Sequence, residues 1–135
     1  MASVRKEILT DCPANEVWSA IRDIGALHTR LVPGFVIDTK LEAGARIVTF
    51  GNGMVIREPI VTLDEEAKRL VWSAEGGVTT HYNAAVEVAT VGGATRVVWT
   101  ADFLPDSTRE TIAGAMQAGM AVMQKTLDRL AKERR

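Results

Sequence analysis

Between residues 35 and 104, hydrophobic and polar side chains alternate with a period of two, interrupted at short intervals by polar or glycine-rich turns. This alternation is typical of strands that bury one face and expose the other. Residues near the start of the chain alternate in the same way. We therefore predict seven strands, at residues 3–10, 35–41, 46–50, 54–63, 70–75, 80–90 and 95–104. Their close spacing favours an antiparallel sheet.

Helical spacing of apolar residues replaces this alternation in two regions. After the first strand, Pro13 suits the first turn of a helix, with Asp11 or Cys12 as its cap. A second short helix is expected at residues 24–30. The end of the chain, residues 108–134, predicts one long helix.

The long helix has an apolar stripe and a start signal. Asp106 or Ser107 is expected to cap it, and Glu110 lies three residues after Ser107, as in a capping box. The stripe consists of Ile112, Met116, Gly119, Met120, Met123, Leu127 and Leu130. A helix of this length must bury its stripe, so we expect it to lie on the sheet. One helix does not fill the hollow of a curved seven-stranded sheet. We therefore predict a single α+β domain, residues 1–135, with a central cavity.

Strand parity identifies the side chains that face this cavity, because successive residues of a strand point to opposite faces. The inward set predicted for four strands is Phe35, Ile37, Val48, Phe50, Tyr82, Ala84, Val86, Val88, Val97, Trp99, Ala101 and Phe103. The helix adds Met116, Met120 and Met123, which suit either a plain core or an adaptable pocket.

Two charged residues fall on the apolar side of the sheet. If Met54 and Ile56 face inward, parity places Glu58 inward as well, and Arg46 shares the side of its apolar neighbours. Unpaired buried charge is costly, so these groups need partners. They are expected to pair with each other, with Tyr82 or with a polar group of a ligand. The alternative is a bulge at the following proline that turns the carboxylate outward.

Composition and charge narrow the function classes. Sixteen basic and seventeen acidic side chains give a net charge of −1, which argues against nucleic-acid binding. Cys12 is the one cysteine, so an intrachain disulfide is excluded, and the first residues lack the apolar stretch of a signal peptide. We expect a cytoplasmic protein, a monomer or homodimer, without membrane insertion. Two histidines without further ligands at metal spacing argue against a metal site, and no cofactor is expected.

Four segments resemble the START-like, or SRPBCC, superfamily, and most closely its polyketide cyclase/dehydratase-type bacterial members. They are residues 13–18, 44–53, 57–66 and 99–105. The resemblance implies the helix-grip fold, in which the sheet wraps around the terminal helix, and a cavity for lipids, sterols, polyketides or plant hormones. In the similar abscisic-acid receptors a strand glutamate and a tyrosine line the pocket, which supports inward Glu58 and Tyr82.

The sequence departs from those receptors at three places. Residues 32–35 lack the pocket lysine, residues 51–54 replace the gate loop, and the segment after Gly77 has no counterpart of the latch. Hormone reception is therefore not implied. The glycines at both loops permit motion of a gate without showing it.

Three functions stay open. The first is a carrier or sensor for a small, mostly apolar molecule, and the second is a cyclase or dehydratase that uses Glu58 as general acid or base with Tyr82 as donor. The third is a protein-interaction module with a filled core. The predicted ligand-binding residues are Phe35, Arg46, Val48, Phe50, Ile56, Glu58, Trp72, Tyr82, Trp99, Met116, Met120 and Met123.

Overall fold

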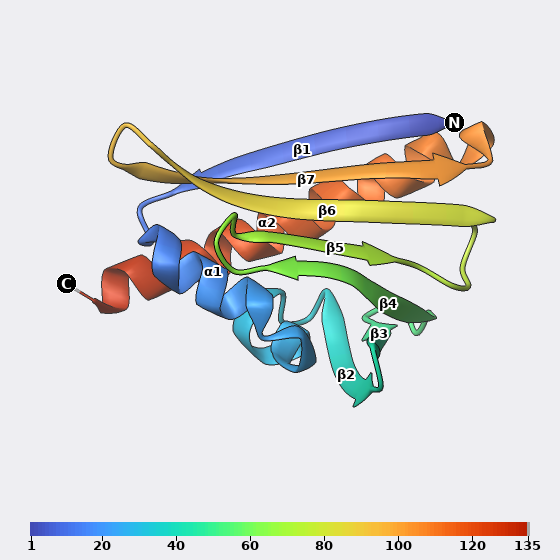
Figure 1. Ribbon diagram of the computed structural model, residues 1–135, viewed down its shortest axis with the longest axis horizontal. Helices are drawn as coiled ribbons and strands as arrows, with labels where there is room; N and C mark the ends of the chain where they lie inside the picture. Colours follow the sequence, from blue (N-terminus) through green and yellow to red (C-terminus); the bar gives the residue numbers. More distant parts are fainter. Residues whose placement is uncertain (135) are drawn as a thin grey trace.

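The computed structural model describes residues 1–134, and it contains the predicted seven strands and long terminal helix (Figure 1). The strands are β1 (Ala2–Thr10), β2 (Val36–Glu42), β3 (Ala45–Phe50), β4 (Val55–Asp64), β5 (Arg69–Ser73), β6 (His81–Val91) and β7 (Ala94–Leu104). The helical elements are α1 (Ala14–Arg22), the 3₁₀ turn η1 (Ile24–Ala26), the π-helical turn η2 (Leu27–Leu31), the 3₁₀ turn η3 (Asp106–Thr108) and α2 (Arg109–Glu133). This is the predicted helix-grip architecture.

The strands form one antiparallel sheet in the order β1-β7-β6-β5-β4-β3-β2. Five hairpins connect the successive strands from β2 to β7, and β1 forms the other edge of the sheet by pairing with β7. In Figure 1 the sheet curves away from β1 and β7 toward β2, and α2 runs along its inner side. The helix packs directly against β1, so the far half of the sheet lies away from it.

The apolar stripe of α2 is buried as predicted at Met116, Gly119, Met120, Met123 and Leu127. The predicted capping box is wrong. No side chain caps the start of the helix, which directly follows the turn η3. The last residue of that turn, Thr108, donates its hydroxyl hydrogen to the carbonyl oxygen of Pro105 at 2.7 Å. A backbone carbonyl thus holds the turn that leads into α2.

The first helix also begins differently from the prediction. Pro13 is the residue before α1 rather than its first residue, and neither Asp11 nor Cys12 is the cap. The N–H groups of Glu16 and Val17 both donate to the carbonyl oxygen of Pro13, at 3.0 Å. A backbone acceptor therefore serves where a side-chain cap was expected.

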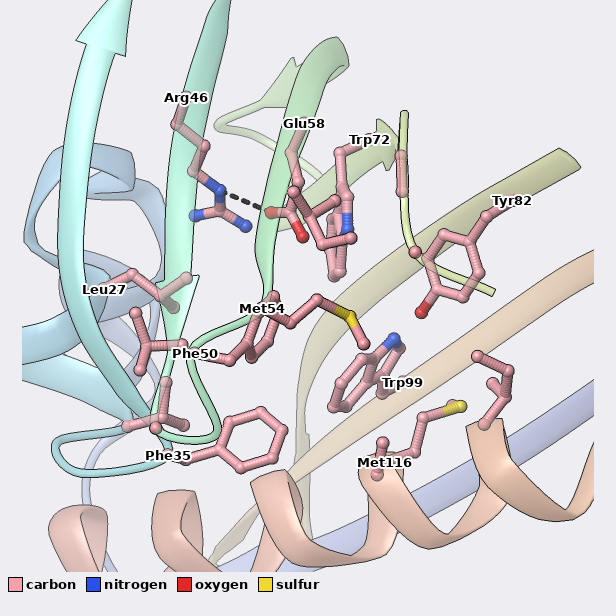
Figure 2. Close-up of a pocket in the computed structure, with 18 of the residues that line it drawn as sticks. Leu27, Phe35, Arg46, Phe50, Met54, Glu58, Trp72, Tyr82, Trp99 and Met116 are labelled. Carbon is pink, nitrogen blue, oxygen red and sulfur yellow. Dashed lines mark hydrogen bonds and ion pairs between the residues drawn. The ribbon is translucent and has the colours of Figure 1, made fainter. Parts of the chain in front are cut away.

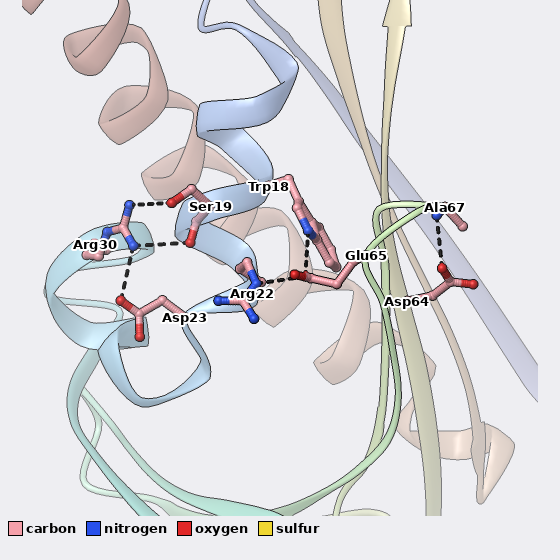
Figure 3. A network of polar contacts seen from close by, with 8 residues as sticks. All are labelled: Trp18, Ser19, Arg22, Asp23, Arg30, Asp64, Glu65 and Ala67. Carbon is pink, nitrogen blue, oxygen red and sulfur yellow. Dashed lines mark hydrogen bonds and ion pairs between the residues drawn. The ribbon is translucent and has the colours of Figure 1, made fainter.

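Polar contacts fix α1 and the turns after it against the sheet (Figure 3). The Trp18 indole nitrogen donates to Glu65 Oε1 at 2.9 Å, and Arg22 Nε donates to the same oxygen at 2.7 Å. Because Glu65 lies just after β4, these bonds tie α1 to the β4–β5 turn. Arg30 in η2 forms an ion pair with Asp23 at 3.0 Å. The result is a fixed helical wall at one end of the curved sheet.

The predicted inward orientation of Ile37 is wrong, since its side chain is 55% exposed while that of Val36 is buried. Pairing of β2 with β3 jumps from Val36–Phe50 to Asp38–Thr49, so Ile37 is the extra residue of a β-bulge. A bulge adds one residue to one strand and reverses the parity beyond it.

Candidate functional site

A cavity of about 470 Å³ lies between the inner face of the sheet, α2 and the helical turns after α1 (Figure 2). Its volume falls in the range of roughly 300–1,000 Å³ that is usual for small-molecule sites. Five of the seven aromatic side chains in the chain line it, namely Phe35, Phe50, Trp72, Tyr82 and Trp99. The wall is therefore mainly apolar.

Ten of the twelve residues predicted for ligand binding line this cavity. They are Phe35, Arg46, Phe50, Ile56, Glu58, Trp72, Tyr82, Trp99, Met116 and Met123. The other two, Val48 and Met120, lie in the packed core and off the cavity wall. Parity and helical phase give the side on which a residue lies, but neighbouring side chains decide whether it reaches open space.

Most of the wall residues that sequence reasoning missed lie in three parts of the fold. The end of α1 and the turns after it contribute Ile21, Leu27, Leu31 and Val32. The two glycine-rich loops contribute residues 51, 52, 54 and 76–79, and the start of α2 contributes Thr111, Ile112 and Ala115. The helical spacing around α1 signalled burial but gave no indication that this helix faces a cavity. The loop residues follow from tertiary placement alone.

Arg46 and Glu58 form a buried ion pair, with 2.8 Å between Arg46 Nε and Glu58 Oε1. The two residues are directly opposite in the β3–β4 ladder, which puts both side chains on the inner face. The expected pairing of the two groups with each other is thus present. The bulge that would turn Glu58 outward is absent at this point, because the adjacent Pro59 pairs in register with Ala45.

Arg46 has further partners that hold its position. Its Nη1 lies 3.4 Å from the carbonyl oxygen of Ile24, and its guanidinium lies over the Trp72 ring, 5.5 Å from the centroid. Burial raises the pKa of the Glu58 carboxyl, and attraction to Arg46 opposes that rise. The pair brings two opposite charges to the wall, so its net charge is zero when both groups are ionised.

Tyr82 and Trp99 provide two further polar groups. In Figure 2 the Tyr82 hydroxyl and the Trp99 ring nitrogen are turned toward each other at the wall of the cavity. Burial raises the pKa of Tyr82, repulsion from Glu58 adds to the rise, and hydrogen bonding by the Trp99 side chain lowers it. The Trp99 Nε1 atom is buried, and within residues 1–134 no group accepts its hydrogen in acceptable geometry.

The α2 side of the cavity is made of small and flexible residues. A Cβ atom at Gly119 would lie 3.0 Å from the Phe35 ring and 3.2 Å from the Trp99 ring, so the bare backbone permits both rings to approach the helix. Met116 and Met123, which precede and follow Gly119 along α2, line the cavity itself. Thioether side chains adapt to irregular shapes, unlike the rings opposite them.

Among residues 1–134, no group of three or more His, Cys, Asp or Glu side chains is placed to hold a metal ion. In the same part of the chain, no helix has both the length and the apolar character needed to cross a membrane.

The comparisons with solved structures agree with the observed fold. A Thermobifida fusca protein superposes with a TM-score of 0.80 at 28% identity, over 98% of this chain and 95% of that chain. A START superfamily protein from Mycobacterium smegmatis gives 0.75 at 14% identity, over 98% of both chains. Ara h 8.0201 gives 0.70 at 14% identity, again over 98% of both chains.

Curated proteins give no match to the sequence. The family model described as polyketide cyclase / dehydrase and lipid transport matches residues 1–134. The chain therefore belongs to this family, within the START-like (SRPBCC) superfamily.

Proposed function

We propose that the protein binds one small, mostly apolar molecule in the cavity between the sheet and α2, as a carrier or sensor. The observation that supports this most is the cavity itself, with its volume of about 470 Å³ and its five aromatic side chains. Burial of a ligand against these rings removes apolar surface from water, which favours binding. The paired Arg46 and Glu58 are suited to orient a polar end of the ligand.

The first experiment identifies what the protein carries. Native mass spectrometry of the purified protein, followed by solvent extraction, is expected to show a bound small molecule. A second measurement uses the uncharged fluorescent probe N-phenyl-1-naphthylamine, whose emission rises in an apolar site. Probe binding is expected with a stoichiometry of one.

Two variants of α2 form a matched test of the location. Ala115 and Ala118 are both exposed on the same helix, but Ala115 lines the cavity and Ala118 does not. Ala115→Trp is expected to reduce probe affinity at least tenfold because the indole occupies ligand space, and Ala118→Trp is expected to leave it unchanged. Equal affinities for both variants would place probe binding outside the cavity and contradict the proposal.

A second candidate is a cyclase or dehydratase in which Glu58 acts as general acid or base. The raised pKa of this buried carboxyl and the family description favour it. The bond from Arg46 opposes it, because that bond already occupies one carboxylate oxygen. Turnover of the extracted ligand that Glu58→Gln abolishes with the fold intact would establish the enzyme. A bound ligand that is never converted supports the carrier.

A further inference from the structure

The Trp99 indole N–H is a hydrogen-bond donor without an acceptor at the wall of the cavity. Its nitrogen is buried, and within the described residues it makes no hydrogen bond of acceptable geometry, although it is close enough to the Tyr82 hydroxyl to lower the pKa of that phenol. Buried donors are nearly always paired in proteins, because an unpaired donor has lost its bonds to water. A donor left in this state beside a ligand-sized cavity is a candidate point of contact with the ligand.

A second donor lies beside the first. The Tyr82 side chain stacks on Phe103, with 6.3 Å between ring centroids, and its hydroxyl lies beside Trp99 in Figure 2. Since the pKa of Tyr82 is raised, the phenol keeps its proton throughout the ordinary pH range and remains able to donate. One ligand oxygen within reach of both groups would accept from both of them.

The charged residues of the cavity wall restrict the net charge of the ligand that carries this oxygen. Within the described part of the chain, Arg46 and Glu58 are the charged residues that line the cavity, and they are paired with each other. An anionic ligand would find its possible cation already bound to a carboxylate, and would face that carboxylate in a site of low dielectric. A cationic ligand would meet the guanidinium in the same way.

We infer that the ligand is uncharged and presents an oxygen acceptor, of the carbonyl type, to the Trp99 N–H and the Tyr82 hydroxyl. The inference rests on the proposed function, and it adds the chemical class of the ligand and the residues that read its polar end. The aromatic wall supplies apolar contact, and the two donors select for the oxygen.

Three probes that share one fused ring system test the inference, namely fluorene, 9-fluorenone and fluorene-9-carboxylate. Each is measured by displacement of N-phenyl-1-naphthylamine from the intact protein. We expect 9-fluorenone to bind roughly three- to tenfold more tightly than fluorene, the gain typical of one added neutral hydrogen bond. The carboxylate is expected to bind more weakly than fluorene, because its charge loses water without gaining a cation.

The atoms that make the bond are observed directly by NMR. The chain has three tryptophans, so a ¹H–¹⁵N spectrum contains three indole N–H signals, which the three Trp→Phe variants assign. We expect the Trp99 indole proton to resonate further downfield in the complex with 9-fluorenone than in the complex with fluorene. Trp18, whose N–H is bonded to Glu65 away from the cavity, serves as the internal control.

Two variants remove one donor each while keeping an aromatic ring. Trp99→Phe and Tyr82→Phe are each expected to reduce the preference for 9-fluorenone over fluorene while fluorene still binds. Equal binding of fluorene and 9-fluorenone, with the Trp99 proton unmoved, would overturn the inference and leave the proposed function standing. Tighter binding of the carboxylate would do the same. Failure of all three probes and of N-phenyl-1-naphthylamine to bind would overturn the proposed function together with the inference.

Discussion

Replacing the buried ion pair by apolar side chains of similar volume gives the most direct measure of what the pair does. The side chains of Arg46 and Glu58 are 4% and 9% exposed, so both charges have lost most of their water. Loss of one member of such a pair leaves an uncompensated charge and costs about 3–5 kcal/mol. The Coulomb attraction between two charges roughly 4 Å apart at an effective dielectric constant of about 20 is about 4 kcal/mol, which is similar in size to that cost.

The two single variants and the double variant are therefore expected to differ strongly. Arg46→Met and Glu58→Leu each lower the free energy of unfolding by about 3–5 kcal/mol. The double variant is expected to be as stable as the wild type or more stable by about 1–4 kcal/mol, because neither charge remains to be desolvated. The expected rise in the pKa of Glu58 agrees with this, since it shows that burial outweighs the attraction to Arg46.

Equilibrium unfolding in urea, followed by tryptophan fluorescence and circular dichroism at pH 7, measures all four free energies. Coincident transitions by the two probes establish two-state behaviour. A double variant destabilised by the sum of the two single losses would show that the residues contribute independently. That result would refute the reasoning from a shared desolvation cost.

Three further outcomes follow from the same structure. In Arg46→Met, the Glu58 carboxyl has a folded-state pKa above its unfolded value, so its protonated form favours the folded state. The free energy of unfolding measured in urea should therefore fall as pH rises above about 4.5, and the double variant should not show this trend. Gly114→Ala, in open space on α2, should raise the free energy of unfolding by about 0.5–1 kcal/mol. Gly119→Ala should give no such gain and should weaken probe binding, because the added methyl group pushes two rings into the cavity. Gly51→Ala should cost about 1–3 kcal/mol in the same assay, since its Cβ would lie 2.5 Å from the Gly34 carbonyl oxygen; a neutral result would disprove that close contact.

Period-two alternation predicted the sheet and the inner position of the charged pair. The turn at residues 51–53 fixes the β3–β4 hairpin, and parity then brings Arg46 and Glu58 to one face. The same reasoning was wrong at Ile37, because a bulge depends on pairing with the neighbouring strand and leaves no mark on alternation. It also put Val48 among the ligand contacts, although its neighbours cover it.

Local sequence carried less information about the ends of the helices and the far wall of the cavity. The starts of both helices rest on backbone carbonyls, those of Pro13 and Pro105, and a pattern of capping side chains does not reveal such acceptors. The residues of η2 that line the cavity are held there by Arg30, which bonds to the preceding helix. That contact joins segments whose relative position a linear pattern does not give.

The cavity has rings and hydrogen-bond donors on the sheet, and thioethers around a bare backbone position on α2. Ladder bonds on both sides hold the strands that carry Phe50, Trp72, Tyr82 and Trp99, so their geometry tolerates little change. The helix positions make no bonds beyond their own helix, and methionine exchanges readily for residues of other shapes. Descendants of this chain that acquired a different guest would therefore be expected to carry their substitutions at Met116, Gly119 and Met123, with the polar end of the guest still read by the same strands.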